Sequence, residues 1–148
     1  MGLNEFEETS QSQWLQLIVN AENLTGYQLQ HELKNYLSLT LQHYTSELTL
    51  PTSIIALSYM EALSLSGTKQ SHELRNIGDQ CLLLSGLFPE RLSRKSISLD
   101  YTITIGRQSY SRLADKNYVE QWDSELFYSL QNHFIGLVDI LYTMRHTQ

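Results

Sequence analysis

Leucines and aromatic residues recur at steps of three and four along most of the chain, which is the spacing of one face of an α-helix. The two longest stripes predict helices near residues 28–46 and over 119–146. Their members are Leu29, Leu33, Leu37, Leu41, Tyr44 and Leu48 in the first, and Val119, Trp122, Leu126, Leu130, His133, Leu137, Leu141 and Met144 in the second. The second stripe predicts one long C-terminal helix.

Shorter stripes predict three further helices. The first carries Trp14, Leu15, Ile18 and Ala21; the second carries Ile54, Leu57, Met60 or Glu61, and Leu63 or Leu65 before a stop at Gly67; the third begins near Thr68 and carries Leu74, Ile77, Cys81, Leu84 and Phe88. Capping-box spacings at Ser10–Gln13, Thr25–Gln28 and, approximately, Asn117–Glu120 indicate helix starts. Pro51 fits the first turn of a helix.

The segment over residues 97–113 supports two interpretations. Ile97, Leu99, Tyr101, Ile103 and Ile105 alternate with polar residues, as in a half-buried strand. A helical stripe also runs through this segment, formed by Leu99, Ile103, Gly106, Tyr110 and Leu113. We favour the helix, because a lone strand among helices has no partner for its backbone hydrogen-bonding groups.

These patterns together predict a single all-α domain over residues 1–148, a bundle of five to six helices with a long C-terminal helix. Residues 1–9 are expected to form a loose N-terminal segment. The 119–146 helix is expected to pack against the helices near 28–46 and 68–86. A chain of 148 residues with 41% hydrophobic and 18% charged residues is long enough to bury one core.

Composition and charge narrow the classes of function. One cysteine, no N-terminal leader pattern and no apolar run long enough to cross a bilayer predict a cytoplasmic protein without a membrane span. A net charge of -6 argues against nucleic-acid binding. Residues 89–116 nevertheless hold six basic and three acidic side chains, so one face is expected to favour anions.

Cys81 and Asp79 are the residues of the leucine-rich segment that raise a question of chemistry. Cys81 shares a helix face with leucines and has no nearby histidine, so we expect it to be a core residue and not a nucleophile. Asp79 has leucines close by, and a buried carboxylate must be paired or hydrogen-bonded. Its candidate partners are Arg75, one turn earlier, or an arginine from residues 91–107.

The next predicted helix carries a polar stripe of Asp100, Thr104, Arg107 and Ser111, with Tyr101 and Tyr110 close by. If it meets the Asp79 helix, the result is either a structural ion-pair network or a pocket for an anionic or polar ligand. The candidate ligand-binding residues are Asp79, Arg91, Arg94, Asp100, Tyr101, Arg107 and Tyr110. The small residues Gly78, Ser85 and Gly86 favour close approach of a neighbouring helix over space for a ligand.

Several of these residues also form a sequence motif. The pattern comprises Gly78, Asp79, Leu82, the run Gly86–Glu90, Arg94, Asp100, Tyr101, Gly106 and Tyr110. It resembles that of an uncharacterised bacterial family of helical proteins, although Thr102 stands where that pattern has a second aromatic residue. The resemblance covers residues 74–114 and implies a bacterial source and a helical fold, but no activity.

No motif predicts a catalytic residue, a cofactor or a metal site, and the five histidines are scattered. We therefore expect a non-enzymatic module that interacts with a protein or a ligand. A homodimer is one form of this, using an aromatic face made of Trp122, Phe127, Tyr128 and Phe134, although a wide buried face would explain these residues equally well. The alternative is an anion-binding protein or an enzyme with a polar site between the Asp79 helix and the Asp100–Tyr110 helix.

Overall fold

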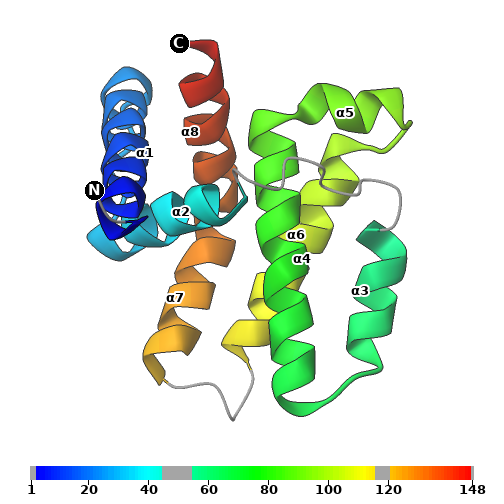
Figure 1. The fold of residues 1–148 in the computed structure, drawn as a ribbon. Coiled ribbons are helices and arrows are strands. Elements are labelled where there is room, and N and C mark those ends of the chain that lie inside the picture. The colour runs from blue at the N-terminus through cyan, green and yellow to red at the C-terminus, as the bar shows by residue number, and fades with distance from the viewer. Residues whose placement is uncertain (1–2, 45–54, 116–120, 148) are drawn as a thin grey trace.

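A computed structural model describes residues 3–44, 55–115 and 121–147, and this part of the chain forms eight helices and no strand (Figure 1). The helices are α1 (Leu3–Thr25), α2 (His31–Tyr44), α3 (Ile55–Leu63), α4 (Gly67–Leu87), α5 (Pro89–Arg94), α6 (Leu99–Ala114), α7 (Gln121–Asn132) and α8 (Phe134–His146). The expected all-α class is confirmed, whereas five to six helices are too few. Within the described residues, no helix has the length and apolar character that crossing a bilayer requires.

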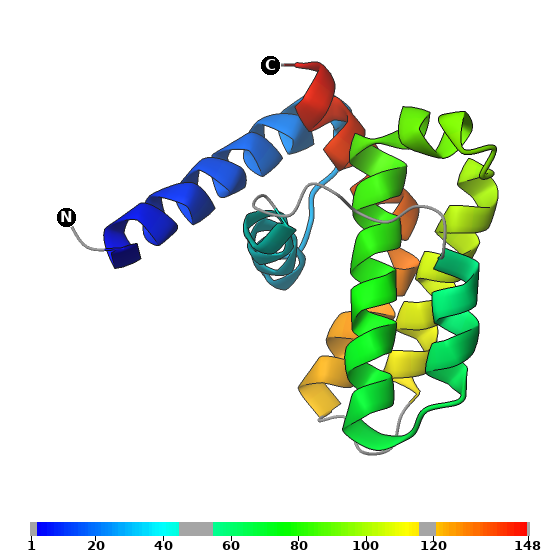
Figure 2. The ribbon, with the colours of Figure 1, turned by 45° about the vertical axis from the view of Figure 1, so that its right-hand side comes forward.

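Helix α4 lies at the centre of the fold and packs against α3, α5, α6 and α8 (Figures 1 and 2). Every residue from Ile77 to Gly86 except Gln80 is buried. The consecutive leucines at 82, 83 and 84 point in different directions around the helix, so α4 is covered on all sides and not along one stripe. Its predicted start near Thr68 is correct to within one residue.

The predicted long C-terminal helix is instead two helices, because the chain breaks at His133. His133 has φ −101° and ψ 13°, and its N–H donates to the Ser129 carbonyl while its own carbonyl accepts from Leu137 N–H. The break lets α7 pack on α6 and α2 while α8 packs on α4 and α1. The apolar spacing runs through His133 without a gap, so periodicity alone does not reveal the break.

The ambiguous segment forms helix α6, as favoured. Its helix start is capped by Ser98, whose Oγ accepts a hydrogen bond from Tyr101 N–H at 3.2 Å. The short helix α5, which was not predicted, begins at Pro89, a residue suited to a first helical turn. Arg145 of α8 forms an ion pair with Glu90 and ties the end of the chain to this junction.

The N-terminal helix is longer than expected. Helix α1 begins at Leu3 and not near Ser10, so the expected loose segment over residues 1–9 is helical from Leu3 onward. Its N-terminal half extends away from the helices around α4 (Figure 2). The predicted helix start at Thr25 is wrong, because Thr25 ends α1 and its Oγ1 donates to the Ala21 carbonyl at 2.8 Å.

The turn between α1 and α2 is fixed by Glu22. Its carboxylate accepts a hydrogen bond from Leu29 N–H at 2.7 Å and pairs with Lys34 at 3.3 Å. Gly26 allows the turn, because its φ of +82° is unfavourable for other residues. The predicted start signals at Pro51 and Asn117–Glu120 lie outside the described residues.

Half of the predicted aromatic face of the last helix belongs to the core. Phe127 and Phe134 are 6% and 0% exposed, whereas Tyr128 is 59% exposed. The side chain of Trp122 lies outside the described part of the chain. Two of the four rings expected to form a dimer surface are therefore buried within the monomer, in line with the wide-face interpretation.

Candidate functional site

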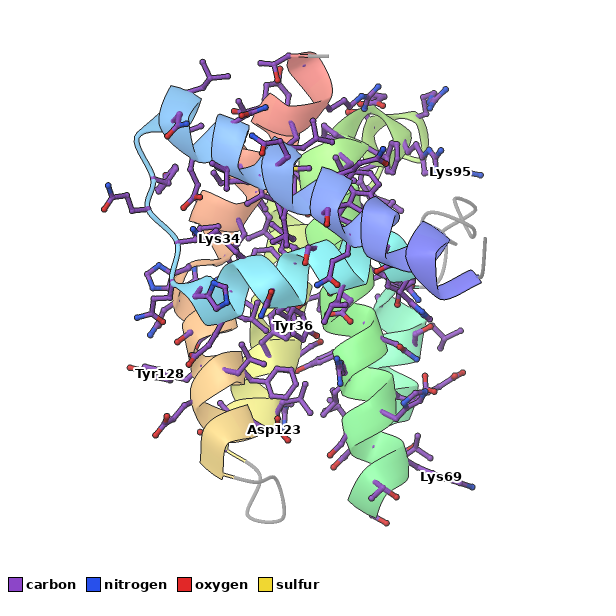
Figure 3. All side chains as sticks on the ribbon, turned by 60° about the vertical axis from the view of Figure 1, so that its left-hand side comes forward. Lys34, Tyr36, Lys69, Lys95, Asp123 and Tyr128 are labelled. Atoms are coloured by element: carbon purple, nitrogen blue, oxygen red, sulfur yellow. The ribbon has the colours of Figure 1, made fainter. Side chains whose placement is uncertain are left out.

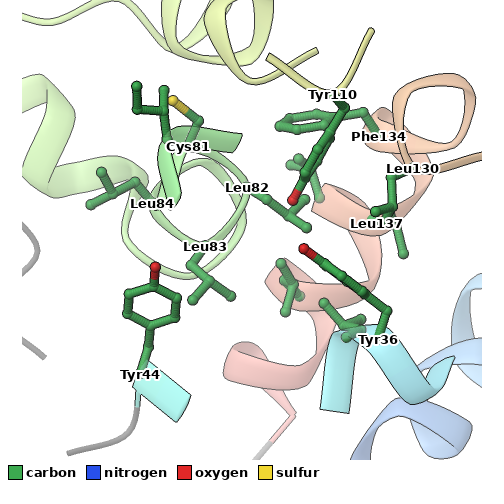
Figure 4. Packing of buried hydrophobic residues seen from close by; sticks show 14 of the residues in the cluster. Tyr36, Tyr44, Cys81, Leu82, Leu83, Leu84, Tyr110, Leu130, Phe134 and Leu137 are labelled. Atoms are coloured by element: carbon green, nitrogen blue, oxygen red, sulfur yellow. The ribbon is translucent and has the colours of Figure 1, made fainter. Parts of the chain in front are cut away.

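A buried carboxylate joins three helices at the centre of the molecule. Asp79, in the middle of α4, is 6% exposed, and its Oδ1 accepts hydrogen bonds from the hydroxyls of Tyr36 at 2.6 Å and Tyr110 at 2.7 Å. Tyr36 belongs to α2 and Tyr110 to α6. Figure 4 shows the hydroxyl ends of the two tyrosines pointing toward one another from opposite sides. The expectation that this acid would be hydrogen-bonded is correct.

Arg75 reaches this network through Tyr36. Its Nε donates to the Tyr36 hydroxyl at 3.1 Å, and its guanidinium carbon lies 5.2 Å from the centroid of the Tyr36 ring. Among the described residues, Arg75 and Asp79 form no direct ion pair. The predicted partner is therefore linked to the carboxylate through a tyrosine. Sequence reasoning missed Tyr36 because it lies 43 residues from Asp79 along the chain.

Burial determines the pKa values of the acidic groups in this network. Removal from water raises the pKa of Asp79 to about 6, against the opposing effect of the two tyrosine hydrogen bonds and the Arg75 charge. Burial and the adjacent carboxylate also raise the pKa of Tyr36 and of Tyr110 well above the usual value. Both hydroxyls therefore remain protonated donors to Asp79 at neutral pH.

Side chains fill the contact between α4 and α6, where a polar pocket was the alternative to a structural network. A Cβ at Gly78 would lie 2.6 Å from the Tyr110 ring, and one at Gly106 would lie 2.6 Å from the Phe134 ring. A Cβ at Gly86 would lie 2.5 Å from Leu141. The close-approach interpretation of Gly78 and Gly86 is thus confirmed, and Tyr110 occupies the space beside Asp79.

The structure brings together only two of the seven predicted ligand-binding residues, Asp79 and Tyr110. Asp100 and Tyr101 are exposed in the first turn of α6, whose inner face is formed by other residues. The remaining three are a half-buried Arg107 on α6, an exposed Arg94 on α5, and Arg91 on α5 with its guanidinium 4.2 Å from the Phe88 ring centroid. The predicted polar stripe thus lies apart from the buried acid.

Cys81 is a core residue, as predicted. It is fully buried, and burial raises the pKa of its thiol to about 12, so the reactive thiolate is suppressed. In Figure 4 its side chain lies on the far side of α4 from Tyr36. The thiol therefore points away from Tyr36, although it lies close enough to Tyr110 to contribute to the raised pKa of that group.

A pocket of about 400 Å³ opens on the other side of the network, between α2, α4 and α7. Its lining residues are Glu32, Asn35, Tyr36, Leu39, Arg75, Asp123, Glu125, Leu126 and Phe127. Figure 3 labels Tyr36 on α2 and Asp123 near the start of α7, the two helices on opposite sides of the pocket. Tyr36 and Arg75 thus form a wall shared by the pocket and the buried Asp79 network.

Sequence reasoning did not predict this pocket, because its walls come from helices that are distant along the chain. The apolar part consists of Leu39, Leu126 and Phe127. Phe127 is held in place by an edge-to-face contact with Tyr36 and a stacked contact with Tyr110, with ring centroids 6.2 Å and 6.0 Å apart. The same two tyrosines that hold Asp79 therefore also position a ring of the pocket.

Comparisons with protein-family models, curated proteins and solved structures gave no match to this chain. Within the described residues, no three His, Cys, Asp or Glu side chains lie close enough together to hold a metal ion. The pocket and the carboxylate behind its wall are therefore the features of this chain that bear on its function.

Proposed function

We propose that this protein is a non-enzymatic binding module that takes a small organic ligand into the pocket between α2, α4 and α7. The observation that carries the proposal is a partly open pocket of about 400 Å³, one wall of which is fixed by a buried and a partly buried hydrogen bond. Ligand sites in proteins commonly have volumes of roughly 300–1,000 Å³ and combine apolar lining with a few fixed polar groups.

The rigidity of the wall supports binding. Tyr36 is held at its hydroxyl by both Arg75 and Asp79, and Phe127 is held between two tyrosine rings. Side chains that are already ordered lose little conformational freedom when a ligand binds, which favours affinity.

The position of the two buried ionisable groups, Asp79 and Cys81, argues against a catalytic role for either of them in the pocket. A general base must come within hydrogen-bonding reach of the substrate proton. The carboxylate of Asp79 is 6% exposed behind Tyr36, and the Cys81 thiol is fully buried. Neither group reaches a molecule in the pocket unless the wall opens.

The setting proposed for this module is a bacterial cytoplasm. The motif around Gly78, Asp79 and Tyr110 supports the bacterial source through its resemblance to a bacterial family, and the single cysteine supports a reducing compartment.

A fragment screen observed by NMR tests the proposal. We expect the bound fragments to shift the methyl signals of Leu39 and Leu126, which line the pocket. Leu39→Trp should fill the pocket and abolish these shifts. Leu57→Trp is the matched control, because Leu57 is similarly exposed, 57% against 52%, but lies on α3. A screen in which no fragment moves either methyl, or in which Leu39→Trp leaves binding unchanged, would refute the proposal.

A further inference from the structure

The described lining of the pocket carries more negative than positive charge. Three carboxylates, those of Glu32, Asp123 and Glu125, face one guanidinium, that of Arg75. The chain as a whole adds to this potential with its net charge of -6. Because charges of one sign lining a cleft concentrate ligands of the opposite sign, the pocket favours cations.

The positive charge of Arg75 already has a role in the wall. Arg75 donates to the Tyr36 hydroxyl, which in turn donates to the buried Asp79 carboxylate. A ligand anion that drew the guanidinium away would leave the buried carboxylate without its nearby cation, which is costly in a low-dielectric interior. Arg75 is therefore better placed to hold the wall than to bind an anion.

Two of the lining carboxylates have no counter-ion among the residues that the structure describes. Glu32 on α2 and Glu125 on α7 are exposed, and neither forms an ion pair or a hydrogen bond through its side chain with another described residue. Asp123 already has an interaction of its own. An ammonium group has three N–H donors and no acceptor, so one such group is suited to carboxylates on two different helices.

The apolar part of the lining defines the remainder of the ligand. Leu39 is 52% exposed at the pocket, and Leu126 and Phe127 lie beside it. Covering this apolar surface with a hydrocarbon group would favour binding. From these features we infer that the pocket binds a protonated amine attached to an apolar aromatic or alkyl body, an inference that rests on the proposed function.

Three probes that share one body but differ in charge test this inference. They are phenethylamine as the cation, phenethyl alcohol as the neutral form and 3-phenylpropionate as the anion, each titrated at neutral pH and low salt. The Leu39 and Leu126 methyl shifts report binding. We expect the amine to bind most tightly and the carboxylate most weakly, and added salt to weaken the amine alone.

Removing negative charge from the pocket lining should weaken binding of the amine and leave binding of the alcohol unchanged. In Glu32→Gln/Glu125→Gln, the dissociation constant of the amine should rise about fivefold, the magnitude of two partly exposed ion pairs, and that of the alcohol should stay unchanged. Glu61→Gln/Glu73→Gln is the matched control, because it removes the same charge from exposed positions on α3 and α4 outside the pocket. Thermal unfolding of both double variants checks that each is folded.

The outcomes separate the ligand class from the proposed function. If the alcohol binds as tightly as the amine, or the carboxylate binds more tightly than the amine, the inference of a cationic ligand is refuted while the binding pocket remains supported. An amine that binds equally to both double variants also overturns it. If the wider fragment screen moves the pocket methyls but none of the three probes does, the amine class fails while the proposed function stands. If the screen itself moves neither methyl, the proposed function fails.

Discussion

Replacing Asp79 with asparagine should remove a pH-dependent component of the stability of the fold. Asparagine keeps an acceptor oxygen for the hydroxyls of Tyr36 and Tyr110, but it has no proton to gain or lose. In the wild type, burial raises the pKa of Asp79 from 3.8 to about 6, so the folded protein holds a proton at pH values where the unfolded chain has released it.

The size of the effect follows from this difference in pKa. Each pKa unit corresponds to about 1.4 kcal/mol, so a difference of about two units gives about 3 kcal/mol over the whole titration. Folding disfavours the ionised carboxylate, so the stabilisation is fully present below about pH 4 and is lost as the pH rises through about 6. Between about pH 8 and about pH 5, the Asp79 carboxyl alone should raise the free energy of unfolding by about 1.4 kcal/mol.

Denaturant unfolding of wild type and Asp79→Asn at a series of pH values measures this quantity. The difference between the two proteins isolates Asp79, because all other titrating groups are common to both. Glu73→Gln is the control, since Glu73 is an exposed carboxylate on the same helix. If the stability curves of wild type and Asp79→Asn run parallel from about pH 8 to about pH 5, the reasoning about the buried acid is wrong.

Further substitutions test the packing around α4. In denaturant unfolding, Gly78→Ala should destabilise the fold by about 1 kcal/mol or more, because overpacking against the buried Tyr110 ring exceeds the gain in helix propensity. Gly136→Ala should be neutral or stabilising, because its added methyl group meets only the exposed Tyr27 ring, at 3.2 Å. Ser85→Ala should raise the melting temperature, because the buried Ser85 Oγ has no hydrogen-bond partner among the described residues and its removal relieves about 1 kcal/mol or more. Native Cys81 should react with a bulky disulfide reagent only at the rate of unfolding, and rapid labelling would contradict its burial.

Periodicity predicted the helices well and their ends less well. The α6 segment was resolved as a helix by the absence of a strand partner, and the burial of Cys81 followed from its position among leucines. The break at His133 was not predictable in this way, because a single residue changed the direction of the chain without changing the apolar spacing. The start at Ser10 failed for a related reason, since a capping-box sequence also occurs within a continuous helix such as α1.

The candidate site was predicted only in part, because residues that are close along the chain are easier to connect than residues that are distant. A carboxylate among leucines must be hydrogen-bonded, which identified Asp79, and Tyr110 was named with it. Tyr36 was missed because its contact with Asp79 spans 43 residues. The pocket was missed because its opposite walls belong to α2 and α7, and only the folded chain brings them together.

The joining of α2, α4 and α6 at one carboxylate has a consequence for how the molecule folds. Docking α4 on α6 without α2 would leave Asp79 with one of its two donors and an incomplete set of hydrogen bonds in an apolar interior. Partly assembled forms are therefore penalised, and we expect the three segments to unfold in a single cooperative transition despite their separation along the chain.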